Sequence, residues 1–208
     1  MPGTRASAGR GGQQVMLLYS FKITPNNRKV ESFIAHYELP VEIRQVNFKA
    51  KETQSPEFFA LNPMRKVPVL VDGDFSLFES NAILTYLARQ FPDTRALPED
   101  AQGRADADRW LHWQSCHLMP FMGALKTGAE TDLAAVEPLL DVLEQTLAGR
   151  DYLLGELSVA DFAVAAYLMT KLGSQLDYSG HPGVAAWRER MLQSKGFRAT
   201  EMRKPPSA

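Results

Sequence analysis

Glu79 and Ser80 stand where residue type and position together suggest binding chemistry. They open the segment ESNAILTYLARQF, whose apolar residues recur at helical spacing. We therefore expect Ser80 to be the N-cap of a helix, where a hydroxyl and free N–H groups can hold a carboxylate. The carboxylate of Glu79 can pair with an ammonium group. An acid beside a helix start suits a ligand that carries both charges at one end, whereas the simpler alternative is helix capping alone.

A second set of candidates lies in the loop FKITPNN, between the first predicted strand and the first predicted helix. Thr24 can donate its hydroxyl proton and Asn26 an amide N–H, and the helix start adds its dipole. Donors of this kind stabilise an anionic nucleophile such as a thiolate and lower the pKa of its thiol. The alternatives are a plain helix N-cap for Asn26 or Asn27 and a loop hydroxyl for Thr24.

Cys116 is the only cysteine of the sequence. A single cysteine excludes an intrachain disulfide and a CxxC redox pair, and it fits a reducing compartment such as the cytoplasm. Thiol chemistry must therefore use a thiol brought in by a ligand, or Cys116 itself. We expect Cys116 to be a buried, small apolar residue rather than a nucleophile. His112 and His117 do not share a helix face, so no metal site is predicted.

The composition is that of an ordinary globular protein. The 208 residues are 45% hydrophobic and 23% charged, with a net charge of −1 and a pI of about 6.4. No basic field is present to hold nucleic acid or anionic lipid. The longest apolar stretches are shorter than the ~20 residues that a membrane helix needs. We therefore expect neither nucleic acid nor a membrane as a partner.

The elements that must position these residues begin with a strand–helix–strand unit. Residues 15–20, VMLLYS, are predicted as a strand buried on both faces, followed by a helix up to Pro40 and a second, parallel strand over 41–48. A short helical piece around PEFFAL leads to VPVLVDGDFSLF, which is typical of a hairpin that turns at Asp72-Gly73. A helix from residue 79 to 91 completes this half.

Residues 92–101, PDTRALPEDA, carry two prolines and no periodicity, so we place a domain linker there. Residues 102–200 show no strand pattern and are predicted to form an all-helical domain, with helices over 102–127, 132–148 and 158–172 and a last one opened by Pro182. Ser158 and Asp161 form a capping-box type start. Residues 1–14 are expected to be a flexible tail, with Met16 as an alternative start, and residues 201–208 a second tail.

Four local signatures, in this order, resemble the glutathione transferase family over residues 15–200. They are TPNNRKV after the first strand, MRKVPVL before the hairpin, FESNAILTYLA at the third helix, and LSVADFAVAAYL in the helical half. Each is a weak or moderate signal alone, but together at these separations they are strong. The resemblance implies a thioredoxin-like domain over residues 15–91, with a mixed four-stranded sheet, followed by a C-terminal helical bundle domain.

The resemblance also implies where glutathione would bind. The Val67-Pro68 bond would be cis, and the backbone of Val67 would pair with the cysteinyl part of the tripeptide like an added strand. Glu79 and Ser80 would hold the γ-glutamyl group, and Lys66 the glycyl carboxylate. The alternatives are an ordinary edge-strand proline at Pro68 and a solvated side chain at Lys66.

Thr24 and Asn26 occupy the reactive position of the family, where other members carry Ser, Tyr or Cys. The string TPN looks like the bacterial nu class and the related fungal prion-like transferases, in which Thr and Asn surround the glutathione sulfur. The resemblance places the long helix over this sulfur, which makes Trp113, His117 and Phe121, together with Met122, candidates for an apolar substrate wall. Core packing or dimer contact is the alternative for these four residues.

We predict a cytoplasmic, homodimeric glutathione transferase that activates the thiol for attack on a small electrophile, with glutathione as co-substrate and no metal. The first alternative is a glutathione-dependent disulfide reductase or peroxidase of nu-class type, acting on a small disulfide substrate. The second is a non-catalytic binding module, because a fold alone does not fix a function.

Overall fold

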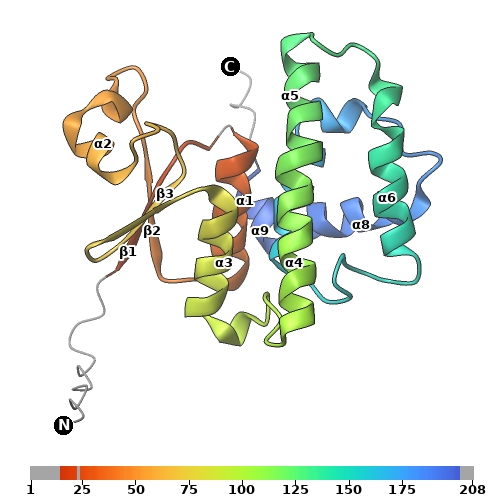
Figure 1. Cartoon of the computed structure of the whole chain (residues 1–208), viewed down its shortest axis with the longest axis horizontal. Coiled ribbons are helices and arrows are strands. Elements are labelled where there is room, and N and C mark those ends of the chain that lie inside the picture. Colours follow the sequence, from red (N-terminus) through yellow and green to blue (C-terminus); the bar gives the residue numbers. More distant parts are fainter. Residues whose placement is uncertain (1–14, 23, 202–208) are drawn as a thin grey trace, which may run out of the picture.

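The structure divides into a sheet-containing half and a helical half that lie side by side (Figure 1). The computed structural model of the chain describes residues 15–22 and 24–201; the predicted tail 1–14 and residues 202–208 lie outside this part. The sheet-containing half consists of β1 (Met16–Ser20), α1 (Pro25–Tyr37), β2 (Val41–Gln45), α2 (Pro56–Leu61), β3 (Val69–Asp72), β4 (Phe75–Phe78) and α3 (Ser80–Gln90).

The four strands form one mixed sheet in the order β2-β1-β3-β4. β1 and β2 are parallel, whereas β3 runs antiparallel to both β1 and β4. Leu18 and Leu70 pack into the core beneath α1 and α3, whereas Val69 packs against Phe58 of α2 on the other face. Alternate residues thus serve opposite faces, as a pleated strand requires. The predicted thioredoxin-like layout is confirmed.

The hairpin turn lies one position later than predicted. β3 ends at Asp72 and β4 begins at Phe75, and these two residues pair, so the turn is Gly73-Asp74. Gly73 has a φ of 59°, a conformation that glycine adopts without steric cost and that two-residue hairpin turns favour. The turn geometry therefore selects the glycine as its first residue.

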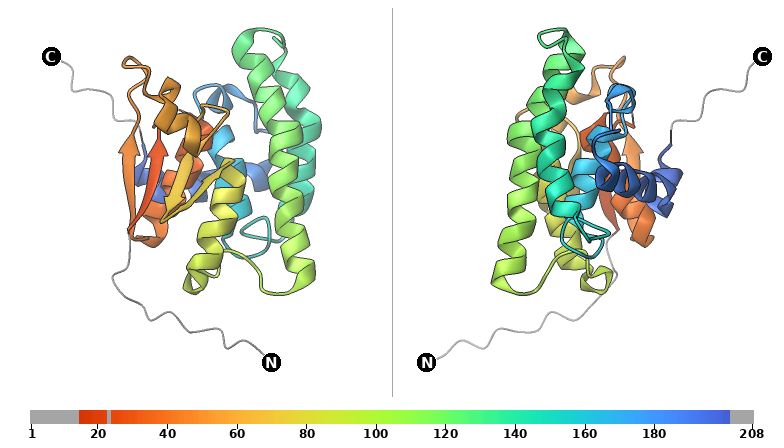
Figure 2. Two further views of the ribbon diagram at one scale, coloured as in Figure 1. Left: turned by 60° about the vertical axis from the view of Figure 1, so that its left-hand side comes forward. Right: turned by 90° about the vertical axis from the view of Figure 1, so that its right-hand side faces the viewer.

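The helical half begins with one long rod. The rod is made of α4 (Ala101–Trp113), the π-helical turn Gln114–Leu118 and α5 (Met119–Thr127). The remaining helices of this half are α6 (Glu137–Leu147), α7 (Val159–Leu168), α8 (Pro182–Gln193) and α9 (Lys195–Ala199). Figure 2 shows α4 and α5 as a continuous helix that forms one edge of the molecule. Within the described residues, none of the helices is both long and apolar enough to cross a membrane.

Two helix boundaries differ from the sequence prediction. The helix expected over 132–148 becomes α-helical only at Glu137, because Pro138 has no N–H to donate and is best placed in a first turn. The helix expected over 158–172 ends at Leu168.

The prediction that Cys116 is buried was wrong: the thiol lies on the exposed face of the π-helical turn.

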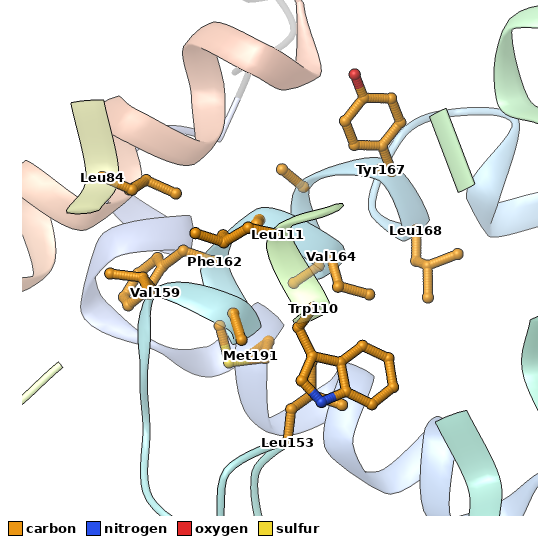
Figure 3. Packing of buried hydrophobic residues seen from close by; sticks show 14 of the residues in the cluster. Leu84, Trp110, Leu111, Leu153, Val159, Phe162, Val164, Tyr167, Leu168 and Met191 are labelled. Atoms are coloured by element: carbon orange, nitrogen blue, oxygen red, sulfur yellow. The ribbon is translucent and has the colours of Figure 1, made fainter. Parts of the chain in front are cut away.

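Helix α7 is the centre of the core, and all ten of its residues are buried (Figure 3). The predicted capping box is present between Ser158 and Asp161. The buried carboxylate of Asp161 also accepts hydrogen bonds from Leu153 N, at 3.0 Å, and Trp187 Nε1, at 2.8 Å. It therefore fixes the start of α7 to the preceding loop and to α8.

The two halves share this core. Phe33 of α1 meets Phe162 of α7 edge to face, with ring centroids 5.3 Å apart. Gly196 of α9 lies so close to α1 that an added Cβ would clash with the carbonyl oxygen of Ser32. Helix α1 is consequently held between the sheet and the helical half, and its first turn has a fixed position relative to both.

Candidate functional site

The loop before β3 contains a cis peptide bond between Val67 and Pro68, as the resemblance implied. Asn62 fixes this loop, because its Nδ2 donates to the carbonyl of Lys66 at 2.8 Å. The side chain of Lys66 is exposed. The backbone of Val67 thus lies at the edge of the site, directly before the strand that crosses the middle of the sheet.

The start of α3 faces the same region but differs in one detail from the prediction. Glu79, not Ser80, is the N-cap: it has a φ of 72°, and Ser80 is the first helical residue. No side chain caps this helix, and Ser80 is buried. The N–H groups of the first turn therefore have no helical partner and are available to an anion. The exposed carboxylate of Glu79 lies directly beside them.

Asn27 joins the turn before α1 to the cis-proline loop. Its Nδ2 donates to Oγ1 of Thr24, the N-cap of α1, and lies 3.4 Å from the carbonyl oxygen of Val67. Its Oδ1 accepts from Ser20 Oγ at 3.1 Å and from Phe21 N at 3.2 Å. Since the hydroxyl of Thr24 accepts from Asn27, its own proton remains available for a ligand.

Asn26 makes a different contact, across the boundary between the two halves. The hydroxyl of Tyr167 donates to Asn26 Oδ1 at 2.9 Å, and Figure 3 shows this hydroxyl pointing away from the apolar cluster. Burial raises the pKa of Tyr167 to about 12, so the phenol stays protonated and remains a donor. With its oxygen engaged, Asn26 keeps the two N–H groups of its amide as donors.

A buried lysine lies behind the start of α3. Lys29 of α1 is 1% exposed, and its Nζ lies 2.6 Å from Asn81 Oδ1 and 2.9 Å from Gln114 Oε1. Burial lowers the pKa of Lys29 to about 7, and the negative charge of Glu79 acts in the opposite direction. Asn81 in turn donates to the carbonyl of Leu111 at 2.8 Å. This network connects the expected glutathione end of α3 to the π-helical turn.

A cavity of about 680 Å³ opens beside Thr24 and lies between the two halves. Its wall combines apolar and basic side chains from α1, α5, α7 and the C-terminal segments; the lining residues are Lys22, Thr24, Pro25, Arg28, Met119, Met122, Gly123, Lys126, Ala166, Tyr167, Met169, Thr170, Lys171, Leu172, Leu192 and Glu201. This volume is within the usual range for a small-molecule site.

Of the four residues predicted for the apolar wall, Met122 lines this cavity. Trp113, His117 and Phe121 are not among the lining residues of the described part. Trp113 ends α4 and His117 lies in the π-helical turn, whereas the cavity is lined from this rod by Met119, Met122 and Lys126 of α5. Phe121 is a neighbour of Met122 in α5, and successive residues of a helix point about 100° apart, so Phe121 lies on a different side of the helix.

Several site residues were not singled out from the sequence. Lys29 stands four positions before Phe33, on the apolar stripe of α1, and a lysine on such a stripe is a recognisable signal. Asn27 was considered only as a cap. Tyr167 and Gln114 carry no local signal, because their partners lie 141 and 85 positions away in the sequence. Within residues 15–22 and 24–201, no group of His, Cys, Asp and Glu side chains is arranged to hold a metal ion.

Comparisons with known proteins match both halves of the chain. Residues 14–89 match the family model described as "Glutathione S-transferase, N-terminal domain", and residues 113–195 match "Glutathione S-transferase, C-terminal domain". Glutathione S-transferase theta-1 of Bos taurus is 34% identical over 200 residues, which are 86% of this chain and 83% of the relative.

Two solved structures are similar along most of their length. A glutathione transferase from Burkholderia graminis, solved with two glutathione molecules bound per subunit, is 31% identical; the match covers 89% of this chain and 86% of that chain, with a TM-score of 0.78. The transferase URE2P6 of Phanerochaete chrysosporium, solved with oxidised glutathione, is 25% identical; the match covers 90% and 94%, with a TM-score of 0.76.

Proposed function

The chain belongs to the glutathione S-transferase family, and from this premise we propose that it binds glutathione and activates the thiol for attack on an electrophile. The observation that carries the proposal is the position of Asn27, which contacts both Thr24 and the carbonyl of Val67. Asn27 and Val67 are 40 positions apart in the sequence, so this contact holds the first turn of α1 and the cis-proline loop around one site. The first suits the sulfur of glutathione and the second suits its cysteinyl backbone.

The tripeptide would be held along its length. The free N–H groups at the start of α3 and the buried hydroxyl of Ser80 suit the carboxylate of the γ-glutamyl group, and Glu79 suits its ammonium. The backbone of Val67, before cis-Pro68, suits the cysteinyl amide. Lys66 is exposed and can reach the glycyl carboxylate.

The sulfur would then lie at the first turn of α1. A free thiol has a pKa near ~8.5, so little of it is thiolate at neutral pH. The Thr24 hydroxyl and the Asn26 amide can each donate a hydrogen bond to the sulfur, which stabilises the thiolate and releases the thiol proton to solvent. The thiolate attacks an electrophilic carbon, a C–S bond forms, and a leaving group such as halide departs with the bonding electrons.

The electrophile would occupy the cavity beside Thr24, with Met122 as part of its apolar wall. Trp113, His117 and Phe121 lie on the same rod but outside the lining of the cavity, and they stay secondary candidates for contact with the substrate. The first test is therefore Met122→Ala, which should raise the KM for an apolar aryl halide.

Disulfide reduction is the second candidate, and one comparison favours it. The Burkholderia graminis transferase holds two glutathione molecules in one subunit, and reduction of a disulfide needs room for a second thiol compound. The bound thiolate would attack a mixed disulfide and release the other half as a thiolate. A second glutathione could then complete the cycle, so no protein cysteine is required.

A homodimer in the cytoplasm, acting in detoxification, completes the proposal. A hollow of about 470 Å³ between α3 and α4 has the apolar residues Phe75, Leu77 and Leu111 in its lining beside polar and charged side chains, and Phe75 is 48% exposed. A second subunit could cover this surface. The single cysteine and the use of a reduced thiol agree with a reducing compartment.

Calorimetry with glutathione and ultraviolet titration of the bound thiolate test the proposal together. We expect binding to the wild type and to Thr24→Ala, a bound-thiol pKa below ~8.5 in the wild type, and turnover reduced on the order of a hundredfold in Thr24→Ala. Thr24→Ser should restore most of the activity. Side-by-side assays of an aryl halide and a hydroxyethyl disulfide separate the two reactions, and absence of glutathione binding would favour a non-catalytic module.

A further inference from the structure

The cavity beside Thr24 has a basic rim as well as an apolar wall. Lys22, Arg28, Lys126 and Lys171 line it, and Glu201 is the single acid among its lining residues. These four cations come from the loop before α1, from α1, from α5 and from the segment after α7. Positive charge therefore surrounds the cavity from both halves of the molecule.

Arg28 differs from the three lysines because it is engaged within the protein. Its Nη1 donates to the carbonyl of Met169 at 3.2 Å, its guanidinium lies 5.2 Å from the ring centre of Phe197, and it is attracted electrostatically to Glu201. Glu201 therefore offsets part of the charge of Arg28, and Arg28 also connects α1 to the C-terminal segments. The cations of the rim that are free to meet a ligand are the three lysines.

Lys22, Lys126 and Lys171 have no carboxylate partner in the described part of the chain. The ion pairs of that part join other residues, and all three lysines are exposed. Lys195, in contrast, is exposed and pairs with Glu38, with 2.7 Å between Nζ and Oε1. With Glu201 as the one acid against four cations in its lining, the cavity has a local excess of positive charge on a protein whose net charge is −1.

The apolar part of the cavity wall restricts the kind of anion that fits beside these lysines. Met119, Met122 and Leu172, with Ala166 and Leu192, provide apolar surface on the side of the helical half. A small inorganic anion would leave that surface in contact with water, whereas an organic molecule with an apolar body and a carboxylate would cover the wall and meet the lysines.

From these observations we propose that the second substrate is an organic anion: an electrophile with an apolar body and a carboxylate, or similarly charged group, that faces Lys22, Lys126 and Lys171. This inference rests on the proposed function, because it concerns the second substrate of that site. Attraction at an exposed rim acts mainly through encounter and ground-state binding, so it falls as ionic strength rises.

The test compares a chlorodinitrobenzoate with its neutral primary amide, which share a leaving group and a ring. At saturating glutathione, the wild type should have a several-fold lower KM for the carboxylate, and the difference should shrink when salt is added. Lys126→Gln and Lys171→Gln should each raise the KM for the carboxylate by about two- to fivefold and leave the KM for the amide unchanged. Arg150→Gln, which removes an exposed charge on the loop after α6, is the matched control.

The outcomes distinguish failure of the charge inference from failure of the proposed transferase function. If both substrates are converted with equal KM values, or if the lysine variants change both equally, the charge inference is overturned and the transferase proposal stands. If neither substrate is converted and calorimetry finds no glutathione binding, the proposed function fails and the inference fails with it. A charge preference lost in the lysine variants and kept in Arg150→Gln supports the inference.

Discussion

Lys29 and Gln114 meet across the boundary between the two halves of the molecule, with 2.9 Å between Nζ and Oε1. Both side chains are buried, and Nε2 of Gln114 has no partner in the described part of the chain. Behind the expected glutathione site lies a polar network enclosed by apolar packing, and such networks fix relative positions at a cost in desolvation.

The stability of the protein should depend on pH through Lys29. In the folded state its pKa is about 7, whereas a lysine in the unfolded chain has an ordinary pKa of 10.5. Between these values the unfolded state binds more protons, so the free energy of unfolding rises with pH, by about 1.4 kcal/mol per pH unit at most. Urea unfolding at a series of pH values from 7 to about 9 measures this slope.

Lys29→Met should remove the Lys29 part of that slope, because methionine does not titrate. Lys49→Met, at an exposed position, is the control and should keep the wild-type slope. Parallel curves for the wild type and Lys29→Met would show that Lys29 keeps an ordinary pKa in the folded protein.

Tyr167→Phe should lower turnover without loosening glutathione. The hydroxyl of Tyr167 orients Asn26 by donating to its Oδ1, and a neutral hydrogen bond contributes about 0.5–1.5 kcal/mol. We expect kcat to fall by roughly two- to tenfold and the pKa of the bound thiol to rise. Tyr178→Phe removes a hydroxyl that bonds to the carbonyl of Gly173 at 2.7 Å, away from Asn26, and should leave the thiol pKa unchanged.

Glu79→Gln should weaken glutathione binding more than it changes catalysis. The substitution removes the charge that is proposed to pair with the γ-glutamyl ammonium, and hydrogen bonds to charged groups contribute about 1.5–3 kcal/mol. Calorimetry should show a Kd raised about tenfold or more, with kcat nearly retained at saturation. Glu137→Gln, in the exposed first turn of α6, provides a charge-matched comparison; an equal change in both variants would contradict the assignment.

Asp161→Ala should be strongly destabilising. The carboxylate accepts from Leu153, Ser158 and Trp187, all buried, and its removal leaves these donors without a partner. We expect the free energy of unfolding to fall by about 3 kcal/mol or more. Asp100→Ala removes an exposed N-cap that accepts from Gly103 N and should cost about 1 kcal/mol. Chemical denaturation of both variants checks the contrast.

The sequence was informative where local patterns decide the structure. The apolar run at residues 15–20, the Gly73 hairpin and the Ser158–Asp161 capping box each follow from neighbours within a few positions, and the structure contains all three. The cis bond at Pro68 was expected from the family resemblance, since spacing alone does not select it.

The features of the site that the sequence did not predict depend on packing between distant segments. Asn26 meets Tyr167 and Lys29 meets Gln114 only after α1 has been placed against the helical half. The face that the long rod presents to the cavity also depends on how the rod packs against the other helices: Met122 lines the cavity, whereas its neighbour Phe121 does not. Sequence periodicity could therefore identify the rod but not the side chains that it presents to the cavity.

A crystal structure of the protein grown with reduced glutathione tests the central claim most directly. We predict the tripeptide backbone beside Val67, its γ-glutamyl carboxylate at the first turn of α3, and its sulfur within hydrogen-bonding distance of Thr24 Oγ1 or Asn26 Nδ2. Glutathione bound elsewhere, or a sulfur that faces neither side chain, would contradict the account.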